Sequence, residues 1–458
     1  MRVKSIFAAV LLTLTAASPA SAQFLPDLQD LFGRGDQQQP RRQGNAVTVD
    51  YNVDFHYFLD VRMFNASDDI FVESETINLA RVSPSAVVRF NQGNQVTHRL
   101  SLGIDLTKDM GTNPTRIETY SDEEHQSSIR NLDLMKDIFF YYNYSRHMGG
   151  KDLGFYAGIH PRTVLQGDYP RAIMADDLIY YDPNIEGITV QDASPRFSFE
   201  LAGDLMGKKG VDRIGGEMAF THMEYRPFKW AVLGLAGSYT HVVGNYLYPC
   251  EVEYAIANPY LKFDFAPLFH MQEFYIKGGV LGTYQLDHRI RLLDDETGEI
   301  VGDKPHFPNG AEATIGIRHW GIGIEDTFYY GENLNTYKST SYEDISNSKK
   351  YIEALYHGDE FYFTRRTVPT WYNRAEVYWQ PLLTDFVSAR VSAVGHFITP
   401  AGKDPESRIG PYVGMQAKAA LLFNLDAFRY QRSGAPDGRT ARSRRAGRRS
   451  ADGPLFSL

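Results

Sequence analysis

Residues 49–63 read Val49-Asp50-Tyr51-Asn52-Val53-Asp54-Phe55-His56-Tyr57-Phe58-Leu59-Asp60-Val61-Arg62-Met63. Every odd-numbered position is apolar or aromatic, and every even-numbered position except Phe58 is polar or charged. Because successive side chains of a β-strand point to opposite faces, this segment has one apolar face and one polar face. The run is longer than a typical strand of about 5–6 residues, and long enough to cross a bilayer obliquely, which takes about 9–11 residues.

The same alternation recurs along the chain. Leu100, Leu102, Ile104 and Leu106, for example, alternate with Arg99, Ser101, Gly103, Asp105 and Thr107. Between Val49 and Leu425 we count roughly 14–16 such runs, and single-chain bacterial barrels have even strand numbers, which favours 14 or 16. The sequence therefore predicts an all-β fold, a closed antiparallel transmembrane β-barrel. Once the strands are assigned, no segment remains that is long enough for a plug domain.

The ends of the chain differ from its middle. Residues 1–22 have a charged start, an apolar stretch and the small residues Ala20-Ser21-Ala22, as in a secretory signal peptide. Residues 23–45 resemble a flexible linker, and residues 46–428 form the predicted barrel. Eight arginines and two aspartates lie in residues 429–458, which we expect to be a disordered basic tail. A signal peptide followed by a barrel predicts export to the outer membrane of a Gram-negative cell.

The composition agrees with a barrel. Aromatic residues make up 13% of the chain, with 29 Tyr, and Tyr is common where barrel strands meet the membrane surfaces. The single cysteine, Cys250, excludes an internal disulfide. The net charge of −9 falls on a chain with a basic tail, so the remainder is strongly acidic and does not suggest binding to nucleic acid.

Charged side chains in the polar phase of the strands are the candidates for a pore lining. Rings of charge in a pore set ion selectivity, although inward charges can also simply neutralise one another and hydrate the lumen. The pore-lining hypothesis covers Asp54, Arg62, Arg99, Asp105, Arg162, Glu200, Asp204, Lys277, Arg390 and His396.

The segment from Leu165 to Gln191 is the best candidate for a functional loop. It mixes carboxylates with apolar residues such as Ile173 and Leu178, and a fully solvated loop would not carry so much apolar surface. Two arrangements are open: the segment folds into the barrel and narrows the pore, or it packs on the rim or on a neighbouring subunit. In the first arrangement Asp168, Asp176, Asp177 and Asp182 lie at the constriction.

Other classes of function have weaker support. The histidines lack a neighbouring nucleophile signature, and no hydrolase, zinc-protease or nucleotide-binding motif is present. The adjacent pair Asp176-Asp177 is too small a ligand set for calcium, so we predict no metal and no cofactor.

The leading function is a porin-like channel for passive diffusion of small hydrophilic solutes, and the protein is not expected to be an enzyme. The alternatives are an enzyme acting on lipid or lipopolysaccharide and a structural or surface-binding barrel. Expected partners are outer-membrane lipid, lipopolysaccharide, the barrel assembly machinery and the solutes.

Two segments carry a resemblance to a known group. Residues 176–187, Asp-Asp-Leu-Ile-Tyr-Tyr-Asp-Pro-Asn-Ile-Glu-Gly, and the strand that ends Asp204-Leu205-Met206-Gly207 resemble uncharacterised outer-membrane barrels of Bacteroidetes-type bacteria. The resemblance covers about residues 46–425. Those proteins are regarded as porin-like, so the resemblance implies a passive channel, but it assigns no site residue. The basic tail departs from their pattern.

Overall fold

The structure is a computed structural model that describes residues 46–64, 74–92, 95–111, 137–206, 215–243, 251–287, 292–293, 300–301, 305–334, 360–362, 369–381, 387–400 and 412–424. The predicted signal peptide (1–22), linker (23–45) and basic tail (429–458) lie outside these residues and stay predictions.

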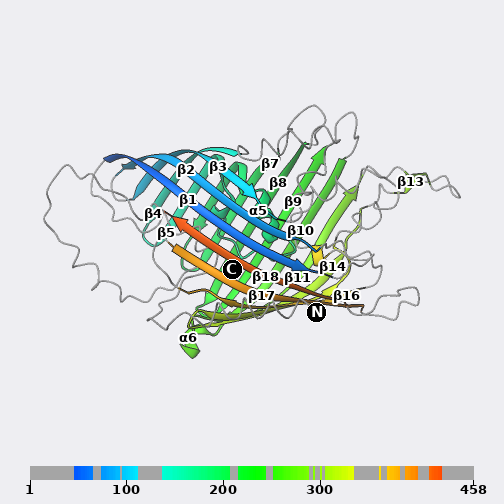
Figure 1. The fold of residues 1–458 in the computed structure, drawn as a ribbon. Helices are drawn as coiled ribbons and strands as arrows, with labels where there is room; N and C mark the ends of the chain where they lie inside the picture. Colours follow the sequence, from blue (N-terminus) through cyan, green and yellow to red (C-terminus); the bar gives the residue numbers. More distant parts are fainter. Residues whose placement is uncertain are drawn as a thin grey trace.

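Sixteen antiparallel strands form one closed barrel (Figure 1). They are β1 (Ala46–Met63), β2 (Thr76–Gln92), β3 (Val96–Asp109), β4 (Asp137–Met148), β5 (Lys151–Pro161), β6 (Asn184–Ala193), β7 (Phe197–Met206), β8 (Gly215–Phe228), β9 (Ala231–Val243), β10 (Glu251–Asp264), β11 (Glu273–Asp287), β14 (Asn309–His319), β15 (Ile322–Gly331), β16 (Thr370–Trp379), β17 (Val387–Pro400) and β18 (Tyr412–Asn424). Each strand pairs with its neighbours in chain order, and the first pairs with the last, from Asp54 opposite Asn424 to Met63 opposite Met415. The closed all-β fold and the expected strand number are confirmed.

The two faces of the wall differ as the alternation predicts. Leu102 is 53% exposed on the outside, whereas its neighbour Ser101 is 1% exposed on the inside. Leu100, Ile104 and Leu201 are exposed in the same way. An exposed apolar belt is costly in water and favourable in hydrocarbon, so the outer surface is that of a membrane-spanning barrel.

The two ends of the barrel differ in the lengths of their connections. Gly149 and Gly150 join β4 to β5 with φ angles of 54° and 88°, the left-handed backbone that a two-residue hairpin turn requires. Two residues also join β8 to β9 and β14 to β15, at the same end. Because strands alternate in direction, the connections that follow β3, β5, β11 and β15 all lie at the opposite end. These cover residues 110–136, 162–183, 288–308 and 332–369, the expected asymmetry of short and long loops.

The predicted loop over residues 165–191 is wrong in its C-terminal part, because Asn184–Ala193 form β6 between β5 and β7. The sequence of this strand does not alternate clearly between apolar and polar residues, because both faces carry exceptions. Glu186 and Asp192 share the outward phase of the exposed Ile188, while the inward Ile185 is apolar and fully buried. The connection itself is residues 162–183, which we call the inward loop.

The remaining elements are short. The inward loop contains the 3-10 helix η2 (Arg162–Val164) and the helix α5 (Asp176–Tyr181), and the helix α6 (Ala266–Phe269) lies between β10 and β11. Strands β12 (Leu292–Leu293) and β13 (Ile300–Val301) form a separate hairpin, and η3 (Glu360–Tyr362) lies in the connection before β16. No helix in the described ranges is long and apolar enough to cross a membrane.

The exposed belt gives a direct test of the fold. We expect Leu102→Arg, at the middle of β3, to lower the free energy of unfolding in bilayers by about 2–4 kcal/mol, because the charge would lie in hydrocarbon. Val47→Arg, close to the end of β1, is the matched control and should cost about 0–1 kcal/mol. Denaturant titration of the refolded protein in lipid vesicles measures both values. Equal costs at the two positions would contradict the assignment of the belt.

Candidate functional site

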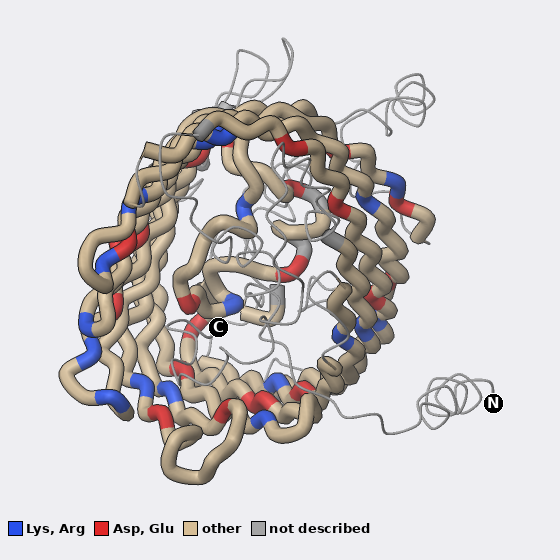
Figure 2. Tube along the Cα trace, turned by 90° about the vertical axis from the view of Figure 1, so that its left-hand side faces the viewer, with Lys and Arg blue, Asp and Glu red and all other residues tan. Residues whose placement is uncertain are grey.

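The inward loop lies inside the barrel. Figure 2 is a view along the barrel, in which part of the chain lies within the ring of strands. Leu165, Ile173 and Leu178 of this loop are buried, and they belong to one apolar cluster with inward side chains of the wall. Of the two arrangements that the sequence left open for this segment, the structure has the one in which it enters the lumen.

Arg162 fixes the start of the inward loop. Its Nε donates to the carbonyl oxygen of Asp182 at 2.9 Å, and its Nη2 donates to the carboxylates of Asp182 and Asp204, each at 2.7 Å. Nη2 also lies 3.1 Å from the carbonyl oxygen of Asn184. A guanidinium can serve several acceptors in fixed directions, so one side chain ties both ends of the loop to β7.

Glu200 on β7 holds the next part of the loop. Its carboxylate accepts hydrogen bonds from the backbone N–H groups of Gln166 and Gly167, at 2.7 and 3.2 Å, and from the Tyr169 hydroxyl at 2.8 Å. Gln191 Nε2 donates to it at 2.7 Å. The acceptor capacity of this buried carboxylate is therefore used to position the loop backbone.

Asp168 is the central anchor. Its two carboxylate oxygens each contact one ammonium group, Lys277 at 2.7 Å and Lys262 at 3.1 Å. Burial by itself raises the pKa of the Asp168 carboxyl, but the charges of Lys262 and Lys277 outweigh this effect and hold the pKa well below its usual range. The backbone N–H of Asp168 donates to Nε2 of His222 at 3.1 Å. Asp168 thus contacts side chains of β8, β10 and β11.

The far part of the inward loop meets the opposite side of the wall. Asp176 pairs with Lys418 of β18 at 3.0 Å and with Arg171 at 3.1 Å. Arg81 of β2 donates to the carbonyl oxygens of Ile179 and Tyr180, at 3.2 and 2.8 Å. The loop therefore crosses the lumen from β7–β11 to β18 and β2, with polar anchors at both sides.

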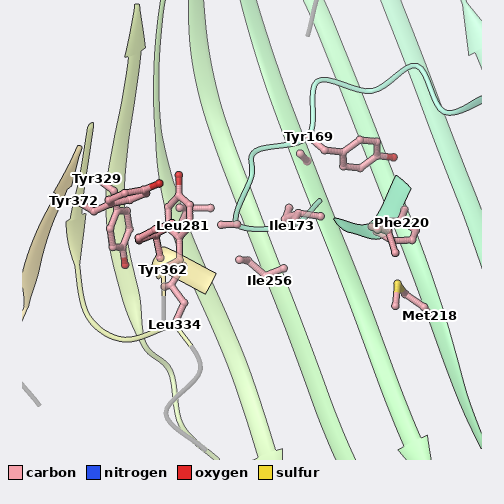
Figure 3. Packing of buried hydrophobic residues seen from close by; sticks show 14 of the residues in the cluster. Tyr169, Ile173, Met218, Phe220, Ile256, Leu281, Tyr329, Leu334, Tyr362 and Tyr372 are labelled. Carbon is pink, nitrogen blue, oxygen red and sulfur yellow. The ribbon is translucent and has the colours of Figure 1, made fainter. Parts of the chain in front are cut away.

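Apolar packing completes the attachment (Figure 3). Tyr169 and Ile173 of the loop lie against Phe220 and Ile256 on the wall, and Leu281 continues the same cluster. Apolar inward side chains are unusual in a water-filled barrel. Here they form the surface on which the loop packs.

A second segment also lies inside the barrel. Phe361 of η3 stacks on the imidazole of His396, with ring centroids 4.1 Å apart, and on Tyr372 at 5.3 Å. Tyr362 donates a hydrogen bond to Glu312, and its carbonyl oxygen accepts from the backbone N–H of Leu334. Both segments belong to the same apolar cluster, so the lumen is narrowed from two connections.

The remaining predicted pore residues lie on the inner wall in separate groups. Arg62 pairs with Asp60 at 3.0 Å and Glu75 at 2.8 Å, and Arg390 pairs with Glu376 at 3.0 Å. The buried residues Arg99, Asp105 and His396 and the half-buried Asp54 share this inward face. The side chain of Asp177 lies outside the described part of the structure. The structure therefore unites Arg162, Glu200, Asp204 and Lys277 with the loop carboxylates Asp168 and Asp182. Arg390 lies in a second group, in which Glu376 and Lys418 link it to the loop carboxylate Asp176, and Arg62 and Arg99 lie apart from both groups. That any of them contacts a permeating solute stays a prediction.

Sequence reasoning missed Lys262, Tyr260 and Glu376. The signal for Lys262 was present, because the alternation that exposes Leu261 and Phe263 on the outside places Lys262 and Tyr260 on the inside. Apolar Ile256 in the same inward phase obscured the pattern of β10.

No family model matches this chain, and no curated protein matches it. Solved outer-membrane barrels are similar in fold at very low identity. A loop-deletion mutant of OmpT, an outer membrane protein of Vibrio cholerae, is 8% identical with a TM-score of 0.44, over 82% of this chain and all of that one. Pseudomonas aeruginosa OprD is 8% identical with a TM-score of 0.36, over 84% and 98%. A mutant of the Rh. blastica porin is 9% identical with a TM-score of 0.34, over 82% and 100%. Function is therefore argued below from the geometry of this chain alone.

The Asp168 anchor predicts a local loss of stability. We expect Asp168→Asn to weaken docking of the inward loop by about 3–5 kcal/mol, because two buried ammonium groups lose their shared counterion. Limited proteolysis of the purified barrel should then cut within residues 162–183. Asp152→Asn, which removes an exposed carboxylate from the same β-hairpin as the loop start, is the control and should leave the loop protected. Equal protection of the wild type and Asp168→Asn would contradict the anchor.

The low pKa of Asp168 sets the pH range of docking. A carboxyl whose pKa is depressed in the folded state stabilises that state fully above its unfolded pKa of about 3.9, and the stabilisation is lost as pH falls towards the folded value. We therefore expect protection of the loop to stay constant from about pH 8 to pH 5 and to fall only in stronger acid. Proteolysis at a series of pH values with an acid-tolerant protease measures this. Release of the loop between neutral pH and pH 5 would show that another group controls docking.

Proposed function

We propose that this protein is a porin-like channel of the outer membrane that lets small hydrophilic solutes diffuse passively. The observation that carries the proposal is the inward loop, which crosses a charged lumen and is anchored at both sides by ion pairs. A loop held in this way narrows the passage to a defined path. Export through the N-terminal signal peptide, and kinship with Bacteroidetes-type porin-like barrels, are parts of the same proposal.

The chemistry of the two wall faces supports a channel. The outward side chains suit hydrocarbon, while the inward face carries charged groups such as Arg62, Arg89 and Arg374. Where Asp176 meets β18, Glu376 and Asp176 lie among Arg171, Arg374, Arg390 and Lys418. Charges in a narrow lumen are screened less than charges in open solvent, so such a group acts on a passing ion. We expect it to influence selectivity.

The enzyme alternative has little support in the side-chain geometry. The contact most like a nucleophile and base is His160 Nε2 with the Thr189 hydroxyl, 2.8 Å apart. Both side chains are fully buried, so a lipid substrate has no path to them. In the described ranges, no group of three potential metal ligands lies together. We therefore propose a channel rather than an enzyme, with membrane lipid, lipopolysaccharide and the assembly machinery as partners of the barrel surface.

Conductance in a planar bilayer tests the proposal. The wild type should give discrete channels in KCl, and replacing residues 165–181 by a short glycine linker should raise the single-channel conductance, because the segment that crosses the lumen is gone. Gly167→Val is a full-length companion: its Cβ would meet Cβ and Cγ of His222 at 2.6 Å, so the loop must move away. It should also raise conductance. Absence of channels from correctly folded protein would favour an enzyme or a surface-binding barrel, and unchanged conductance after deletion would place the solute path away from the loop.

A further inference from the structure

Two lysines on the inner wall face each other directly. Lys262 on β10 and Lys277 on β11 are cross-strand partners, and both are buried. Like charges directly opposite in a sheet repel, and buried ammonium groups are costly unless they are paired. This pair therefore requires an anion between its two members.

Besides Asp168, side chains of the wall hold the two lysines in place. The Lys262 ammonium lies 4.4 Å from the ring centroid of Tyr275, and the Lys277 ammonium lies 4.3 Å from that of Tyr260, so each lysine crosses to a tyrosine on the other strand. Tyr260 donates to Glu224 of β8 at 3.0 Å, and Tyr275 donates to Glu325 of β15 at 3.1 Å. All these groups are on strands, so these contacts of the lysines do not depend on the inward loop, and an anion from solution can take the place of Asp168 between the ammonium groups.

Asp168 makes two kinds of contact at the lysine pair. Its carboxylate gives one oxygen to each ammonium group, and its own backbone N–H donates to Nε2 of His222. In aspartate this N–H is attached to Cα, which is the second carbon from the side-chain carboxyl group. The wall thus presents two cations and the ring nitrogen Nε2 of His222, which also lies 2.9 Å from the Tyr260 hydroxyl. Lys277 also interacts with Glu312, but it is Asp168 that bridges the two ammonium groups, so its departure leaves the position between them to another anion.

We propose that the Lys262–Lys277 pair, with His222, is a solute-binding site that the loop residue Asp168 occupies in this structure. Its ligands are solutes with a carboxylate and a hydrogen-bond donor on the second carbon from it, such as acylated aspartate, and they compete with Asp168. A small hollow lined by Gln166, Gly167, Glu200 and His222 adjoins the site, and because Gln166 and Gly167 belong to the inward loop, the rest of the solute takes the space that the displaced loop leaves. This inference rests on the proposed channel function and names the class of solute that the channel selects.

Competition with Asp168 lowers the affinity of the site for a free solute in the wild type. A tethered group has an effective concentration on the order of millimolar or higher, so a free solute binds only when it exceeds that value or when the loop is displaced. Removal of the Asp168 charge vacates the site, while the lysines and tyrosines of the wall stay in place.

Calorimetric titration of the full-length protein in detergent tests the site, with N-acetyl-L-aspartate amide as the probe. We expect Asp168→Asn to bind it at least about tenfold more tightly than the wild type, since the tethered competitor is removed. N-acetyl-L-asparagine amide, which lacks the carboxylate, should not bind. Adding Lys277→Gln to Asp168→Asn should abolish the gain. Affinity equal in wild type and Asp168→Asn, or a gain that survives Lys277→Gln, would overturn the proposal.

Folding and conduction are measured on the same samples. Heat-modifiable migration on unboiled gels shows which variants form the barrel, and if Asp168→Asn does not, Gly167→Val replaces it because it displaces the loop with Asp168 intact. The same tenfold gain is then expected, and its absence overturns the proposal. Channels in KCl without probe binding would reject the site and keep the channel. Probe binding without channels would reject the channel and keep the site.

Discussion

Closure of the sheet between β1 and β18 is the constraint on which the rest of the molecule depends. In hydrocarbon, an unpaired N–H or C=O group costs several kcal/mol, so an edge strand is not tolerated there. The ladder from Asp54–Asn424 to Met63–Met415 removes both edges at once. Closure also creates an interior that is separate from the membrane. Every charged inward side chain must then find water or a partner inside the ring.

The inward loop provides partners for several of these charged inward side chains. Its carboxylates Asp168, Asp176 and Asp182 are counterions for Lys277, Lys418 and Arg162 on the inner face of the barrel. Apolar side chains such as Ile256 and Leu281 line the same region, and the loop covers them too. Polar anchors set the position of the loop, and apolar burial stabilises it there. The narrowing of the lumen follows from both.

Alternation alone predicts the fold, because a strand in a barrel wall has two environments and a period of two residues. The one exception in the first strand, Phe58, has a structural reason: its ring packs on Tyr180 of the inward loop, with centroids 5.1 Å apart. Strand β6 is missed for the same reason, since Ile185 packs beneath the loop. Pairs such as Asp168 with Lys277 could not be predicted, because which strands face each other across the lumen depends on strand number and closure. The sequence predicts closure and 14 or 16 strands, but a difference of two strands changes which side chains lie opposite each other.

The anchors of the inward loop also fix an order of events during assembly. Asp176 binds Lys418, which is 242 positions away on the last strand, and Arg81 on the second strand holds the carbonyl oxygen of Tyr180. These partners come within reach of one loop only when the first and last strands have joined. Contacts of such long sequence separation form late, because the chain between them must be ordered first. The far part of the loop therefore docks only after the barrel has sealed, whereas its anchors on β7, β8, β10 and β11 do not depend on that step.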